Sequence, residues 1–159
     1  MIIKIEFPFI VRNQTANQKN KWTKNIFKTI QKNEVKKKCE TFAYLAKKNY
    51  KIESPFYGAI LHRYWFFKQK RPRDYDNFCA GTKYYTDALV SQGIILKDDN
   101  HHLNMGIVHF LEKQQTEKIV YVLYTLEEKE FKLITEKNNN DAIKIIDFAT
   151  KQSEEKVFL

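Results

Sequence analysis

The sequence predicts a single α+β domain in which a mixed, mostly antiparallel sheet carries helices packed against it. Its 159 residues suffice for one hydrophobic core and are too few for two domains of ordinary size. β-rich segments alternate with segments of helical periodicity, which is the pattern of a sheet covered by helices. Only four glycines and three prolines are present, so we expect no interdomain linker.

The first third of the chain predicts one strand followed by two helices. Residues 2–10 are β-rich, and Pro8 cannot donate a ladder hydrogen bond, which places this strand at a sheet edge or strand end. The polar, lysine-rich residues 13–31 allow a first helix. A second helix is predicted from Asn33, as its N-cap, to Lys48. Its apolar stripe comprises Val35, Cys39, Phe42, Leu45 and Ala46.

The middle of the chain predicts the centre of the sheet and the helix that follows it. Residues 56–68 are apolar and aromatic on both alternating sets, as in an internal strand, and the aromatic residues 64–67 are assigned to the core. Residues 74–92 then change to helical periodicity, and Gly93 occupies the position of a C′ glycine. The helical stripe comprises Phe78, Thr82, Tyr85 and Leu89.

The last third predicts a hairpin and a C-terminal extension. Residues 102–111 and 118–126 are two β-rich runs joined by a polar loop, which favours an antiparallel hairpin. Residues 131–135 predict a further strand, and residues 141–152 predict a helix with Ile145, Ile146 and Ala149 inward. We therefore expect a domain over residues 1–126 and an extension over 127–159 that packs on it.

Composition excludes several classes of protein. Hydrophobic residues make up 43% of the chain, which argues against wholesale disorder, yet no apolar run reaches the about 18 residues of a membrane span. The first residues lack the layout of a signal peptide. Cys39 and Cys79 show neither a disulfide framework nor zinc-ligand spacing and are interpreted as small apolar residues. We expect a cytoplasmic protein with no membrane partner and no small-molecule cofactor.

Charge is distributed unevenly along the chain. The net charge is +9, and residues 1–73 hold 18 basic and 4 acidic side chains, whereas residues 74–159 hold 10 and 15. A local basic excess favours a polyanionic partner such as nucleic acid. The run of lysines at 36–38 is more typical of a solvated helix face. The better candidates for phosphate contact border the aspartates and are Lys68, Lys70, Arg71 and Arg73.

Five of the seven aspartates lie between positions 74 and 99. Asp74, Asp76 and one or both of Asp98 and Asp99 form a candidate set of oxygen ligands for Mg²⁺, with Mn²⁺ as a substitute. Asp76, Lys83 and Asp87 fall on one stripe of the predicted helix. Such a site beside a basic surface suits metal-assisted hydrolysis of a phosphodiester, with a lysine steadying the phosphate. Helix capping and turn formation are the alternative role for these aspartates.

Between positions 74 and 99 the chain reads, in order, Asp74-Tyr75-Asp76-Asn77, Lys83, Thr86-Asp87-Ala88-Leu89, Gly93 and Asp98-Asp99. This order closely resembles that of the RusA-type crossover-junction endodeoxyribonucleases, the Holliday junction resolvases of prophages and other mobile elements. Residues 78–82 place Lys83 about one helical turn later than is usual in that family.

The resemblance, which covers roughly residues 1–126, implies a RusA-like fold, a homodimer and magnesium-dependent paired nicking of four-way DNA junctions in recombination and repair. It also implies a prophage or mobile element as the source. Family roles fall on Asp74, Asp76 and Asp99 as metal-binding catalytic carboxylates and on Lys83 as the catalytic lysine. Asn77 and Asp87 are expected beside them, where Asp87 either holds the motif loop by hydrogen bonds or contacts metal.

Two other functions remain open on the sequence. One is a related nuclease for flap or fork DNA. The other is a non-catalytic nucleic-acid binding module, in which the basic half binds phosphate and the aspartates only cap and brace. His101 and His102 follow the acidic pair directly, and we expect them to be non-catalytic.

Overall fold

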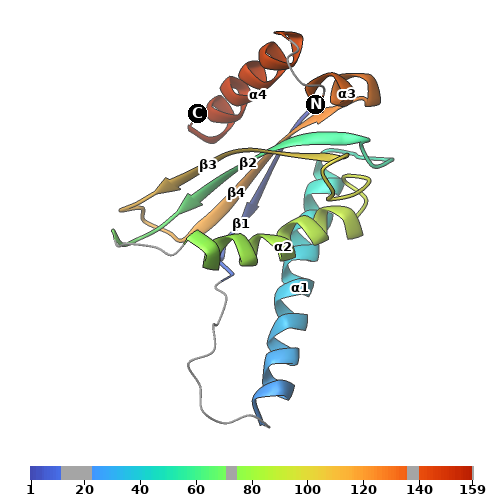
Figure 1. Ribbon diagram of the computed structural model, residues 1–159. Coiled ribbons are helices and arrows are strands. Elements are labelled where there is room, and N and C mark those ends of the chain that lie inside the picture. Colours follow the sequence, from blue (N-terminus) through green and yellow to red (C-terminus); the bar gives the residue numbers. More distant parts are fainter. Residues whose placement is uncertain (12–22, 71–74, 136–139, 159) are drawn as a thin grey trace.

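The computed structural model describes residues 1–11, 23–70, 75–135 and 140–158, without the side chains of residues 23–30 and 75–80. This part of the chain forms a mixed four-stranded sheet and four helices, which confirms the α+β class (Figure 1). The elements are β1 (Ile2–Phe7), α1 (Thr23–Asn49), β2 (Gly58–Phe66), α2 (Tyr75–Ser91), β3 (Leu103–Leu111), β4 (Lys118–Leu126), α3 (Glu128–Thr135) and α4 (Asn140–Phe158).

The strand order in the sheet is β1-β4-β2-β3. β4 is antiparallel to both β1 and β2, whereas β3 is parallel to β2, so the sheet is mixed and mostly antiparallel as expected. β1 lies at one edge and ends just before Pro8, and β2 lies inside the sheet; both predictions are confirmed.

The predicted hairpin of residues 102–111 and 118–126 is wrong. Both segments are strands, but β2 lies between them and pairs with β4 from Gly58↔Leu126 to Phe66↔Lys118. The two strands with apolar residues on both faces, β2 and β4, thereby occupy the interior, where both faces are buried. β3, which is more exposed along its length, takes the edge.

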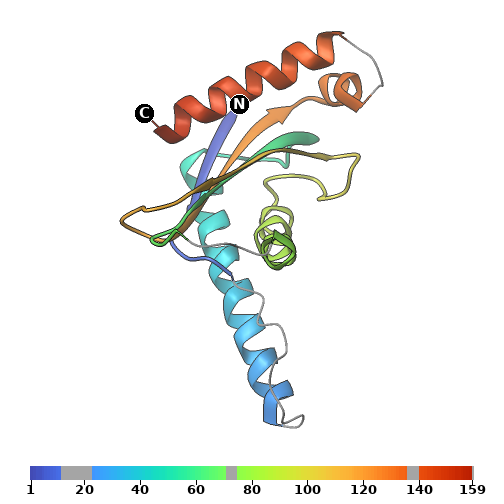
Figure 2. The ribbon, with the colours of Figure 1, turned by 60° about the vertical axis from the view of Figure 1, so that its left-hand side comes forward.

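Helices cover both faces of the sheet (Figures 1 and 2). α1 and α2 pack on one face around a large core that includes Leu61, Trp65 and Tyr121. α3 and α4 pack on the other, where Ile60 and Tyr64 lie. The expected alternation of β2 side chains between two covered faces is therefore confirmed. No helix in the described ranges is both long and apolar enough to cross a membrane.

α1 departs from the expectation of two helices. It runs without interruption from Thr23 to Asn49, so Asn33 is an exposed residue inside the helix and the N-cap assignment is wrong. Among the α1 side chains that the structure describes, those of residues 31–49, the buried ones are Cys39, Ala43 and Ala46. Leu45, which was expected to face inward, is 44% exposed, because the face that meets α2 and β1 is centred on the small residues.

The bounds of α2 and its buried side are close to those predicted from the sequence. Thr82, Tyr85 and Leu89 are buried as predicted, while the side chain of Phe78 lies outside the description. The helix ends where expected, with Gly93 at a φ of 65° in the left-handed region.

The C-terminal extension packs on the sheet through helices alone. Residues 131–135, predicted as a strand, belong to α3, because Phe131 and Ile134 are buried together at helical spacing. α4 contains the predicted helix and extends it at both ends, with Ala149 buried. It crosses all four strands, and the Tyr64 and Ser153 hydroxyls form a buried hydrogen bond of 2.7 Å.

Candidate functional site

The predicted site residues are distributed over α2 and its two flanking connections. Lys68 and Lys70 follow β2 and are exposed. Asp76 and Asn77 lie in the first turn of α2, with side chains outside the description. Outside the described residues altogether are Asp74, Arg71 and Arg73. The geometry of the site is therefore built from Lys83, Asp87, Asp98 and Asp99.

Asp87 and Asp98 come together although eleven positions separate them. Their side chains are in hydrogen-bond contact, so the two carboxylates repel each other unless a cation offsets the repulsion. Partial burial is the main cause that raises the pKa of Asp87, and Asp98 raises it further. Lys83, one turn earlier on α2, opposes the rise. The structure thus brings Lys83, Asp87 and Asp98 into one cluster, which we call the α2 cluster.

The end of α2 accounts for how Asp98 reaches Asp87. Gly93 N–H donates to the Val90 carbonyl at 2.9 Å, and Ile94 N–H donates to the Leu89 carbonyl at 2.8 Å. This pair of bonds is the Schellman arrangement, which reverses the chain after a helix. Ile94 and Ile95 are then buried, which holds the returning chain against the body. Asp98 is consequently presented to the last turns of the helix that it has just left.

Asp99 makes different contacts from its neighbour. Its Oδ1 lies 2.6 Å from His102 Nδ1 and accepts the His101 N–H at 3.0 Å. The hydrogen bond with His102 is the main cause that holds the pKa of Asp99 below its usual range. The carbonyl of Asp99 also accepts the Leu103 N–H, which starts β3. Asp99 therefore organises the turn before β3, and Asp98 belongs to the α2 cluster.

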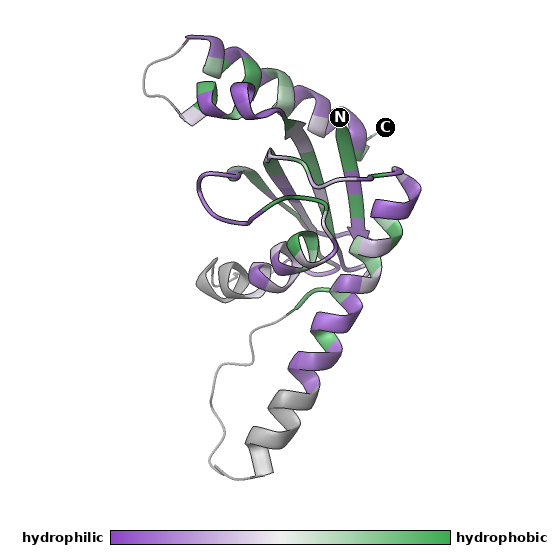
Figure 3. Ribbon diagram, turned by 90° about the vertical axis from the view of Figure 1, so that its right-hand side faces the viewer, coloured by the Kyte–Doolittle hydropathy of each residue, from purple (hydrophilic) through white to green (hydrophobic). Residues whose placement is uncertain are grey.

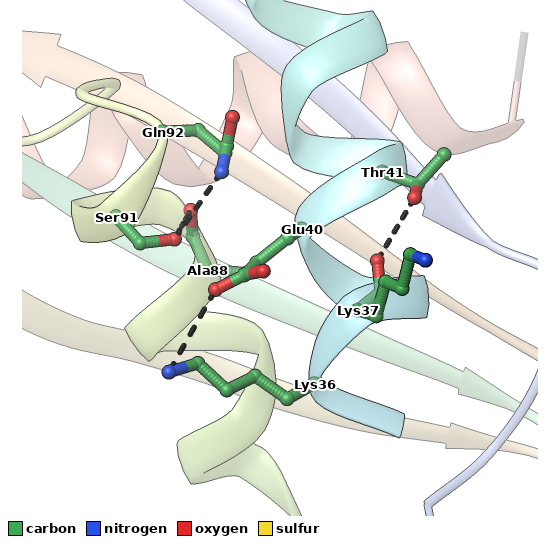
Figure 4. Close-up of polar contacts among 7 residues, drawn as sticks. All are labelled: Lys36, Lys37, Glu40, Thr41, Ala88, Ser91 and Gln92. Carbon is green, nitrogen blue, oxygen red and sulfur yellow. Dashed lines mark hydrogen bonds and ion pairs between the residues drawn. The ribbon is translucent and has the colours of Figure 1, made fainter. Parts of the chain in front are cut away.

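A fourth residue, Lys36, approaches the α2 cluster from α1. Figure 4 shows Lys36 and Glu40 between the two helices, with an Nζ–Oε1 distance of 3.9 Å. Lys36 also acts electrostatically on Asp87, whose pKa it lowers. From the sequence, Lys36 was expected on a solvated helix face. Its proximity to Asp87 could not be predicted from any local pattern, because it depends on how α1 packs on α2.

The α2 cluster is chemically suited to a hard divalent cation. It provides two carboxyl groups in contact, and Mg²⁺ is typically bound by one or two carboxylates together with water and phosphate oxygens. Within the described ranges, no group of three or more histidine, cysteine, aspartate or glutamate side chains could hold a metal ion. A site in this cluster would thus take its remaining ligands from water or from substrate, because Asp76 in the first turn of α2 lies about 16 Å away along the helix.

Comparison of the sequence with models of known protein families and with curated proteins finds no match.

Proposed function

We propose that the protein is a Mg²⁺-dependent endodeoxyribonuclease of the RusA type that nicks branched DNA, and that its substrate is a four-way junction. The observation that carries the proposal is the contact between Asp87 and Asp98 beside Lys83. Three members of the motif that resembles RusA-type resolvases are thus neighbours in space as well as ordered in sequence.

The residues of the α2 cluster divide the expected chemistry among them. Asp98 and Asp87 would hold the metal. Asp74, Asp76 and Asp99 remain candidates from the sequence motif, but Asp76 lies about 16 Å before Asp87 along the helix and would have to bind a separate ion. A bound Mg²⁺ supplies an activated water and neutralises charge on the leaving oxygen. Lys83 is exposed and adjacent, so its ammonium group can contact a phosphate that approaches from solvent. Lys68 and Lys70 would bind the flanking backbone.

A homodimer completes the proposal, because resolution of a four-way junction needs two symmetric nicks. A two-fold interface relates two identical sites by the symmetry that the junction itself has. Each subunit would cleave one of the paired strands.

Nicking of a labelled four-way junction, with and without Mg²⁺ or Mn²⁺, tests this proposal. The variants are Asp76→Asn, Asp98→Asn and Lys83→Ala, and Asp147→Asn on the exposed side of α4 is the matched control. We expect symmetric, metal-dependent nicks by the wild type and the control, and a loss of at least about 100-fold in the three variants. Linear duplex, flap and fork substrates in the same assay distinguish a resolvase from a related branched-DNA nuclease.

Two results would contradict the proposal. If only Lys83→Ala loses activity while Asp76→Asn and Asp98→Asn remain active, the metal mechanism is wrong. If the wild type binds the junction in a salt-dependent manner but nicks it with no metal, the protein is a nucleic-acid binding module and the aspartates are structural.

A further inference from the structure

We propose that the basic segment of α1, residues 31–38, is an arm that binds duplex DNA in its major groove and guides it to the α2 cluster. This inference rests on the proposed function, because it names the part of the molecule that holds the arms of the branched substrate.

The charge of α1 favours a polyanionic partner. The helix carries eight lysines and two glutamates, whereas α3 and α4 on the opposite face of the sheet together carry five lysines and six acidic residues. Of the lysines in the segment, Lys32, Lys36, Lys37 and Lys38 are all exposed. Lys36 has one ion pair, with Glu40, at the long distance of 3.9 Å. A polyanion is the partner that this surface favours.

The basic segment lies at the margin of the folded body. α1 packs on the rest of the protein through Cys39, Ala43 and Ala46, with Val35 half-buried, and residues 31–34 are all exposed. A helix of 27 residues is about 40 Å long, and α1 extends well past the sheet (Figures 1 and 2). Hydrophilic residues predominate along the coloured part of α1 beyond the sheet (Figure 3).

The lysines of the segment are arranged in a way that suits a DNA groove. At 100° per residue, positions 32, 37 and 38 are spread around the helix instead of forming one stripe. A major groove admits an α-helix and has phosphates on both of its walls, so lysines on several sides of the helix suit that environment. A flat contact with one protein surface would favour charge on a single side.

The basic surface of α1 is continuous with the α2 cluster. Lys36 belongs to the segment and also acts on Asp87, so the basic surface of α1 leads directly to the carboxylates. A duplex held by the segment would bring its backbone to the cluster from the side of α1.

The experiment measures junction binding without metal over a series of salt concentrations. The test variant is Lys32→Gln/Lys37→Gln/Lys38→Gln, which leaves Lys36 in place. The matched control, Lys129→Gln/Lys144→Gln/Lys151→Gln, removes three exposed lysines from α3 and α4. Each lost phosphate contact lowers the slope of log K against log salt by about 0.9, so the test variant should lose about 2 to 3 units of slope. The control should keep the wild-type slope, and circular dichroism verifies that all three proteins are folded.

The outcomes separate this inference from the proposed function. If the wild type binds and nicks the junction and the test variant keeps its slope, the arm is refuted and the nuclease stands. If the wild type binds without nicking and the test variant loses its slope, the arm stands and the nuclease fails. Absence of any binding refutes both. A change in molar mass of the test variant by light scattering, with unchanged DNA affinity, would instead assign the segment to a protein interface.

Discussion

Acidification from pH 7 to pH 5 is expected to destabilise the fold through His62, a single buried residue of β2. The side chain is 1% exposed; its Nδ1 accepts the Ile107 N–H at 3.2 Å and its Nε2 has no hydrogen-bond partner. Gly106 makes room for the ring, because a Cβ at that position would lie 2.7 Å from His62 Cε1. The ring is therefore held neutral, with no acceptor for a second proton.

Burial is the main cause that lowers the pKa of His62, from 6.5 to about 4, and His109 lowers it further. The unfolded chain has the higher pKa, so between these two values it binds a proton that the folded chain does not bind. Stability is therefore fully present above pH 6.5 and is lost as the pH falls toward 4. Proton linkage gives a loss of about 2 kcal/mol between pH 7 and pH 5.

Urea denaturation at pH 7, 6, 5.5 and 5 measures this loss. His62→Gln keeps an acceptor for the Ile107 N–H and cannot titrate, so its free energy of unfolding should fall by about 2 kcal/mol less than that of the wild type over this range. His101→Gln, at an exposed position, is the matched control and should follow the wild type. If the free energy of unfolding falls equally with pH in the wild type and in His62→Gln, the pH dependence does not come from His62.

Two further substitutions test the packing on each face of the sheet. Gly81→Ala improves helix propensity but would place a Cβ 2.6 Å from the Val11 carbonyl oxygen, so we expect a net loss of about 1–2 kcal/mol in urea denaturation, and a gain would contradict that close approach. Tyr64→Phe leaves the Ser153 hydroxyl without its 2.7 Å partner and should cost about 1 kcal/mol with faster amide exchange in α4; unchanged exchange would show that this bond does not hold the helix.

Elements whose signals are local could be predicted from the sequence. The two-sided apolar pattern of β2 and the helical stripe with Gly93 after it both depend on residues within one segment. Strand pairing, in contrast, depends on segments that are far apart in the sequence. β3 and β4 are adjacent in sequence, yet β4 pairs with β2 along its whole length, which places the two strands that are buried on both faces side by side inside the sheet. Adjacency in sequence was therefore a poor guide to the sheet order.

Both errors in the helices came from a local preference that the structure does not follow. Residues 131–135 were assigned to a strand by β propensity, but Phe131 and Ile134 at helical spacing can bury together beside Leu126. Asn33 was taken as an N-cap because capping residues favour helix starts, although the helix forms on both sides of it. For residues 131–135, the packing of Phe131 and Ile134 outweighed a weak strand preference. At Asn33, the helical preference of the residues on both sides outweighed the capping preference.

The candidate site could also be predicted only in part from the sequence. The sequence placed two adjacent aspartates after α2 but could not say which would meet the helix. The choice depends on His102, which lies close enough to Asp99 for a 2.6 Å contact and thereby leaves Asp98 to approach Asp87. The Asp99 carboxylate accepts the His101 N–H and contacts the His102 ring, so it has fewer lone pairs left for a metal. In the proposed site, Asp98 would therefore be the better placed ligand, although the resemblance to RusA-type resolvases assigns that role to Asp99.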